Sequence, residues 1–472
     1  MLQDYSYIEV EFEAITYTLS IKAVGNGSVS YGEVSVRGET STFSVAEGAS
    51  AVVKLIPDDA YLVKSLKVNN EDVTSGITDS IYTINNINSN IDIEAIFAIV
   101  GTISNSGFNY KVVSEDEKTV VLSKGDYGLY INIPSTFNAY NIEWTVTGIE
   151  QGALEDASEL AAIIWNPEIK LEEKISNPNL LLYVKSADYA PDDIKNVIVN
   201  NIAKSITLTD AESGNNFYCP QEFTAEKISY VHNYSMKTGY NTCQGWESIV
   251  LPFNVAMITN NSGIALVPHS KWTYGDSKRP FWLYSMSENG WNAEPAIKAN
   301  KPYIISMPNN ENYDEEYNLS GDIVFSASDI KVAVSDDISS SKSGHRYLVP
   351  NYLNQEKNSE IYALNVNNLW DKNTESDMAE GSAFVRGLRQ VRPFEAYMTI
   401  DSGGAATRSI SIFGDGNATG IESLPMINNG KSGNIKVYTL SGVLIKQGTD
   451  ESVTEGLPKG VYIINNRKVV VD

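Results

Sequence analysis

The sequence predicts a mainly β protein built from several domains. Runs of β-branched and aromatic residues recur along the 472 residues, among them YTLSIKAV, TVVLSKG, KPYIISM and GVYIINN, and they are bounded by Gly, Asn, Asp or Ser. This pattern is typical of strands joined by turns. Only two stretches favour a helix: Gln151 to Leu160, with apolar residues at helical spacing, and Pro191 to Val197, where proline suits a first helical turn.

Length and charge limit the class of protein. At roughly 150 residues per domain the chain provides three or four domains, and 42% hydrophobic residues allow each domain to bury a core. The formal net charge of −24 argues against a nucleic-acid partner, because a phosphate-binding surface needs clustered Lys and Arg. The sequence contains no apolar run of about 18 residues or more, so no membrane span is expected.

An internal repeat sets the first domain boundary. Residues 8–15 read IEVEFEAI and residues 93–100 read IEAIFAIV, which align with Ile8 over Ile93. Residues 1–15 are therefore predicted to be the remnant of a preceding repeat, and residues 16–100 one complete β domain. Its GNGS sequence is predicted to form a hairpin turn, because Gly and Asn tolerate positive φ.

Three parts of this domain carry a family resemblance: YTLSIKAVGNGSVSY, the central EGASAVVKLIPDDAYLVKSLKVNN and the closing IEAIF. Together they resemble a divergent internalin-type B-repeat of bacterial surface proteins. The resemblance implies a spacer or display unit on a cell surface. It brings no catalytic role.

The next segment, residues 101–204, is predicted to be β structure with a short leucine-rich element. VTGIEQGALEDASELAAIIWNP at Val146 to Pro167 resembles the leucine-rich repeat of surface antigens from Bacteroidetes, and NPNLLLYV offers a second half-repeat. A solenoid needs about three repeats to fold independently, so this element is expected to pack against the neighbouring β structure. An ordinary short helix covering a sheet is the alternative.

The remaining chain divides into a large block, a linker and a C-terminal module. Residues 205–413 are predicted to form a large β-sandwich-like domain, and the Gly- and Asn-rich residues 414–424 a linker. Residues 425–472 contain VYTLSG, LPKGVYII and NRKVVV, an order that resembles the C-terminal sorting domain of type IX secretion. The resemblance implies export across the outer membrane through the secretion machinery, followed by release or anchoring. A small β-sandwich without a transport role is the alternative.

The sequence holds little that indicates catalysis. It contains no GxSxG, HExxH, GxxxxGK[ST] or strand-associated GxGxxG motif, and only three histidines, His232, His269 and His345. No catalytic residue, metal site or cofactor is therefore predicted, and the protein is expected not to be an enzyme. A Cys–His pair at His232 is less favoured than a surface histidine. The acidic NYDEEYN sequence is interpreted as a solvated loop rather than a glycosidase carboxyl pair.

Two features of the large block remain open. Trp272, Trp282 and Trp291 belong to an aromatic-rich stretch that could stack on sugar rings or fill the core. Strand alternation places Phe281 and Leu283 opposite Trp282 and Tyr284, so at most one of these sets should face solvent. Cys219 and Cys243 could meet across a hairpin and form a disulfide, or remain two buried thiols.

These observations predict a secreted or cell-surface binding protein. The expected partner is a host protein or glycan, and the expected location is extracellular or at the outer-membrane surface. The alternative is a glycan-active hydrolase of the cell surface, which would need two carboxyl groups facing each other across a cleft.

Overall fold

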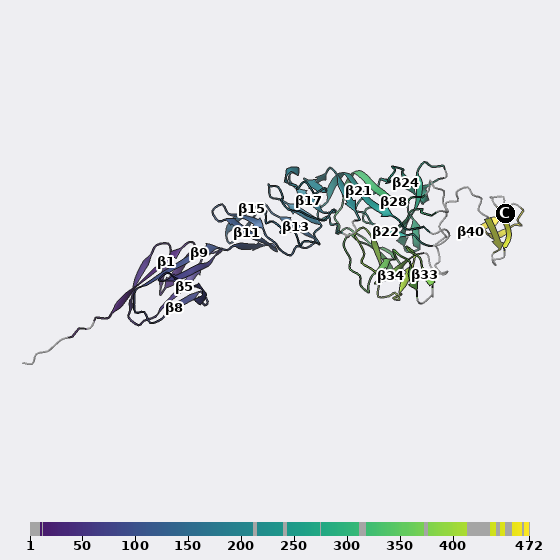
Figure 1. The fold of residues 1–472 in the computed structure, drawn as a ribbon. Coiled ribbons are helices and arrows are strands. Elements are labelled where there is room, and N and C mark those ends of the chain that lie inside the picture. Colours follow the sequence, from purple (N-terminus) through teal and green to yellow (C-terminus); the bar gives the residue numbers. More distant parts are fainter. Residues whose placement is uncertain are drawn as a thin grey trace, which may run out of the picture. The chain divides into compact units, whose positions relative to one another are not determined.

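The computed structural model is built almost entirely from β-strands, which confirms the predicted fold class (Figure 1). It describes residues 10–11, 13–210, 215–238, 243–273, 275–310, 318–371, 376–412, 435–439, 444–448, 456–464 and 467–471. The helical elements of this described part are three short 3-10 turns, η1 (Thr74–Gly76), η2 (Ala187–Tyr189) and η3 (His269–Lys271). None of its helices is long and apolar enough to cross a membrane.

Both predicted helices are wrong. Gln151 to Leu160 forms consecutive turns, and Gly152 takes the left-handed φ of +73°, which an α-helix does not allow. Leu154 and Leu160 are nevertheless buried. The spacing of the apolar residues therefore indicates which side chains of a folded loop are buried, and it does not indicate a helix. The stretch from Pro191 is a short turn that leads into strand β18 (Val197–Val199).

Contacts divide the chain into two compact units. Unit 1 comprises residues 1–125 and 134–153, and unit 2 comprises residues 126–133 and 154–472. The predicted remnant, residues 1–15, lies mostly outside the described residues. The predicted linker, residues 414–424, lies wholly outside them.

The first part of unit 1 is a two-sheet sandwich over residues 16–99. One sheet has the order β4-β1-β9-β6-β7 and the other β3-β2-β5-β8, with β1 and β9 parallel. Inward residues of both sheets, such as Ile21, Phe97 and Leu55, form one core. The strands are β1 (Thr16–Val24), β2 (Gly27–Tyr31), β3 (Val34–Val36), β4 (Ser41–Ala46), β5 (Ala51–Pro57), β6 (Tyr61–Val68), β7 (Glu71–Asp72), β8 (Ile81–Ile84) and β9 (Ile91–Ile99).

The GNGS turn joins the two sheets instead of closing a hairpin. Strand β1 pairs with β4 and β9, whereas β2 pairs with β3 and β5. Gly25 has a φ of +86°, and a Cβ at Gly27 would lie 2.5 Å from the Phe97 ring. Glycine is therefore required here for a tight crossing beside the core, and the hairpin prediction is wrong.

The rest of unit 1 is a five-stranded sheet with the order β10-β11-β12-β15-β14. Its buried face carries Tyr110, Phe137 and Trp144. The strands are β10 (Thr102–Asn105), β11 (Phe108–Ser114), β12 (Thr119–Leu122), β14 (Thr136–Ala139) and β15 (Ile142–Ile149).

Unit 2 begins with a stack of parallel strands. Strands β13 (Tyr130–Ile133), β16 (Ala162–Trp165), β17 (Leu181–Val184) and β18 pair in parallel, in that order. Buried asparagines brace the loops between them: Asn179 accepts from Thr209 N at 2.9 Å, and Asn196 donates to Pro178 O at 3.0 Å. The connections between these strands differ in length, so the sequence shows no regular period, and the leucine-rich resemblance stays a prediction.

The same sheet continues across the predicted boundary at residue 205. Strand β19 (Ile202–Ala203) pairs with β21 (Phe223–Tyr234), which also pairs with β20 (Ile206–Thr209). The antiparallel β28 (Gly321–Val332) then lies beside β21 (Figure 1). Strand β23 (Met257–Asn260) pairs with β28 and completes the sheet. The parallel stack and the large block therefore share one continuous sheet.

Three layers of strands make up the large block. A middle sheet has the order β22-β27-β25-β24, and a further sheet has the order β29-β30-β35-β31-β34-β36. The strands are β22 (Glu247–Ile249), β24 (Leu266–Pro268), β25 (Arg279–Ser287), β26 (Gly290–Ala293), β27 (Tyr303–Ser306), β29 (Ser341–Ser343), β30 (Arg346–Pro350), β31 (Tyr362–Leu364), β32 (Leu369–Asp371), β33 (Ser376–Met378), β34 (Ala383–Arg386), β35 (Ala396–Ile400) and β36 (Ser409–Ser411).

The middle sheet is buried on both faces. Phe281 and Leu283 of β25 pack into the core shared with β21 and β28. Trp282 and Met286, which point the other way, pack into a second core with β31, β34 and β35. The predicted alternation of β25 is confirmed, and neither face of this strand is left for solvent.

The described C-terminal strands form a separate antiparallel sheet with the order β38-β37-β39-β40. Val437 is fully buried, and the Tyr462 hydroxyl donates to Pro458 O at 2.7 Å. The strands are β37 (Ile435–Thr439), β38 (Leu444–Gly448), β39 (Gly460–Ile464) and β40 (Arg467–Val471).

Candidate ligand-binding site

The tryptophans predicted as a sugar platform belong to the core. Trp282 and Trp291 are 1% and 9% exposed, and the half-buried Trp272 packs against the same cluster. Trp291 donates its ring N–H to Ile412 O at 2.7 Å, which fixes the ring inside the fold. The stacking hypothesis fails for Trp282 and Trp291, because a sugar needs an accessible ring face and packing covers these two rings, while Trp272 stays partly exposed.

One tryptophan is largely exposed. Trp370 in β32 is 57% exposed, while the other six tryptophans of the chain are buried or half-buried. Its short strand pairs only with β33 within the described residues. The sequence missed it because Trp370 stands outside the aromatic-rich stretch, and a lone tryptophan in a polar segment gave no signal.

The two cysteines are separate thiols in the structure. Cys219 lies in the core next to β21, where its thiol donates to Gln221 O at 3.2 Å. Cys243 packs against the other core, 3.9 Å from Ser382 O. Burial raises the pKa of Cys219 to about 11. The two cysteines do not form a disulfide, because they pack against different cores.

His232 holds a cluster of charged side chains, here called the His232 cluster: Asp210, His232 and Glu247. The histidine lies on β21, Asp210 follows β20, and Glu247 begins β22. Its Nδ1 lies 2.5 Å from Asp210 Oδ2 and its Nε2 lies 2.6 Å from Glu247 Oε2. The three side chains are only 16–25% exposed. The expectation of a surface histidine is therefore wrong.

The chemistry of this cluster is that of a fixed cation. Burial opposes protonation of His232, but the charge of Glu247 and the hydrogen bonds to Asp210 and Glu247 outweigh it and raise the pKa of His232 to about 10. The imidazolium donates from both nitrogens, so neither can take a proton from a substrate or a cysteine. The cluster ties three strands together and is unsuited to general-base catalysis.

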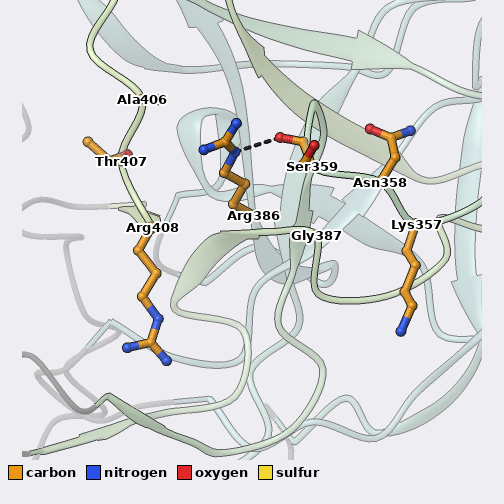
Figure 2. A pocket seen from close by; sticks show the side chains of 8 residues that line it. All are labelled: Lys357, Asn358, Ser359, Arg386, Gly387, Ala406, Thr407 and Arg408. Atoms are coloured by element: carbon orange, nitrogen blue, oxygen red, sulfur yellow. Dashed lines mark hydrogen bonds between the residues drawn. The ribbon is translucent and has the colours of Figure 1, made fainter.

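A hollow opens at one end of the third sheet, here called the basic hollow. Its volume is about 560 Å³, within the range of small-molecule sites. It lies where β31 begins, β34 ends and β36 begins. Its lining residues are Lys357, Asn358, Ser359, Arg386, Gly387, Ala406, Thr407 and Arg408 (Figure 2).

Backbone hydrogen bonds fix the walls of the basic hollow. Arg386 N donates to Arg408 O at 3.0 Å, and Gly387 N donates to Ile361 O at 2.9 Å. The Asn358 side chain accepts from Glu360 N at 2.8 Å, which closes a tight turn. Gly387 has a φ of +57°, and a Cβ there would lie 3.3 Å from Asn358 O. The rim is thus preformed by the sheet and its turns.

The cations of the basic hollow stand out against an acidic chain. Five of the eight arginines lie within residues 346–408, whereas the whole chain has a net charge of −24. Lys357, Arg386 and Arg408 are exposed. Arg386 Nε donates to Ser359 O at 2.5 Å, which orients its guanidinium (Figure 2). The arginine-rich composition was the one sequence signal that could have located this site.

Comparison with protein-family models, with curated proteins and with solved structures finds no match to this chain. The function is therefore argued from the site itself.

Proposed function

We propose that this protein is a secreted or cell-surface binding protein that recognises a host protein or glycan through the basic hollow. The observation that carries the proposal is the preformed rim with three exposed cations, Lys357, Arg386 and Arg408. Fixed walls lower the ordering cost of binding, so such a site can gain affinity from few contacts. The sandwich of unit 1 would serve as a spacer that displays this site.

The alternative, a glycan-active hydrolase, is less well supported. Two carboxyl groups of the large block, Asp210 and Glu247, are brought together, as a hydrolase would require. His232 stands between them and occupies an oxygen of each. The acidic NYDEEYN stretch lies outside the described residues except for its last residue. We therefore favour binding over hydrolysis.

Glycan and host-protein arrays test the proposal with the full chain. We expect specific binding by the wild type, and its loss in the double variant Arg386→Gln/Arg408→Gln. The control Lys271→Gln/Lys278→Gln removes two exposed charges from the same block, outside the hollow, and should bind normally. Equal binding by the double variant would place the ligand elsewhere. Release of new sugar ends from an array glycan would favour the hydrolase.

The C-terminal sheet would direct the protein to the cell surface or the medium. The proposal rests on its resemblance to a sorting domain and on a strand set that pairs within itself. Deletion of residues 421–472 should abolish surface labelling in the native host and leave the other parts folded. Surface labelling at the full-length level would contradict this role.

A further inference from the structure

We infer that the ligand of the basic hollow is an acidic polysaccharide, with carboxylate or sulfate groups spaced along its chain. The inference rests on the proposed binding function and names its ligand class. It follows from how the cations are placed, from what else lines the hollow, and from the charge of the surrounding chain.

The three cations do not converge on one point. Figure 2 shows Lys357 and Arg408 at opposite edges of the hollow, and neither points toward Arg386. A single phosphate or carboxylate is normally held by donors that meet at one place. Cations at separate edges instead match a ligand that carries several separated negative charges.

Arg386 is oriented for such a contact. Its Nε is held by Ser359 O, which fixes the plane of the guanidinium. Within the described residues, no hydrogen bond engages either of its Nη groups. These groups form the part of the arginine fork that binds an oxyanion with two parallel bonds. The tether therefore prepares Arg386 for a carboxylate or sulfate.

The remaining lining favours a sugar over an acidic peptide. Protein partners usually gain affinity from aromatic or aliphatic anchors in apolar pockets. The lining residues include no aromatic side chain, and among their uncharged members Ala406 and Gly387 leave room while Asn358 and Thr407 are polar. A sugar ring is already rigid, so it loses less conformational freedom on binding than a flexible peptide does, and it suits a hollow that offers cations but no aromatic anchor.

The local charge also permits an anionic ligand. Residues 341–412 contain eight Lys or Arg and eight Asp or Glu, so this part is neutral while the whole chain is at −24. At physiological salt, charges farther away than roughly 8 Å are largely screened. An acidic ligand at the hollow therefore meets its cations without strong repulsion from the rest of the protein.

Four polymers of similar length test the inference on the immobilised full chain: polygalacturonate, chondroitin sulfate, dextran and poly-glutamate. We expect binding to at least one acidic polysaccharide, and binding to dextran and poly-glutamate at least about tenfold weaker. The double variant Arg386→Gln/Arg408→Gln should weaken acidic-polysaccharide binding by about tenfold or more. The control Lys271→Gln/Lys278→Gln should not.

Each other outcome overturns the inference in a distinct way. Binding to dextran as strong as binding to the acidic polysaccharides would indicate a glycan-binding protein that does not recognise its ligand by charge. Equal binding to poly-glutamate would indicate an acidic peptide ligand. Binding to none of the polymers would reject this ligand class, while the arrays above would still decide the binding function. Because Arg386 also supports a loop, Lys357→Gln/Arg408→Gln serves as a second variant, and full binding by it would also count against the site.

Discussion

Two groups of charged side chains in the large block are built in opposite ways. The His232 cluster combines one cation with two carboxylates, and its members are at least three-quarters buried. The basic hollow gathers three cations at the end of a sheet, two on loops and one on the last residue of β34, and all three are exposed. The charges of the His232 cluster pair with one another, whereas the cations of the basic hollow face solvent.

The difference separates charge that holds a fold together from charge that is available for binding. A buried ion is tolerated only when partners satisfy it, and those partners then leave it nothing to offer a ligand. Exposed cations stabilise a fold little, so a cluster of them in an acidic protein points to a role outside the fold. A search for perturbed pKa values alone would have identified His232 as the candidate functional residue, whereas solvent exposure identifies Arg386.

The largest expected effect is on stability, from His232→Gln. The change leaves Asp210 and Glu247 close together without their shared cation. We expect the free energy of unfolding to fall by about 2–4 kcal/mol, somewhat less than for a fully buried pair because the groups keep some solvent. Urea unfolding measures the loss. The folded variant should bind its ligand as the wild type does. Weakened binding would show that the His232 cluster and the basic hollow are coupled.

The pH dependence of stability is the next test. The pKa of His232 is raised from 6.5 to about 10 in the folded protein, so its contribution is complete below pH 6.5 and is lost as the pH rises through about 10. The free energy of unfolding of the wild type should therefore decline over this interval. The His232→Gln variant should lack this decline. A parallel decline in both proteins would assign it to other groups.

The sequence revealed the strands far better than their partners. The alternation of β25 was readable, but its burial on both faces depends on β34 and β35, which follow about a hundred residues later. Trp282 could therefore be assigned to one side of a strand, and only the second core decides that this side is covered. Local pattern fixes which side chains share a face, and tertiary packing decides what that face meets.

The candidate sites show the same limit. His232 acquires its chemistry from Asp210 and Glu247, which are 22 and 15 residues away on other elements. The basic hollow is likewise assembled from three separate segments. The turn at Gly25 was expected from its residues, but its direction was not, because φ preferences do not say which sheet receives the next strand.

A smaller effect is expected from Gly387→Ala. The left-handed φ of +57° and the 3.3 Å approach to Asn358 O both oppose a Cβ. We expect a loss of stability of about 1–2 kcal/mol and weaker ligand binding, because the wall of the hollow must shift. Gly344→Ala is a matched control, with a φ of +56° and nothing within 4 Å of its Cβ. It should lose similar stability but keep full binding, and equal binding losses would refute a local effect.

The smallest effect on stability is expected from Lys357→Gln, and it mirrors the largest. Like His232→Gln, it removes one positive charge, but Lys357 is exposed at the basic hollow. The free energy of unfolding should change by no more than about 0.5 kcal/mol, as for most surface substitutions, while ligand binding weakens. Urea unfolding and polymer binding on the same sample separate these two results. A loss of stability comparable to that of His232→Gln would show that Lys357 holds the fold together, and the distinction between charges paired inside the fold and charges exposed for binding would then fail at this residue.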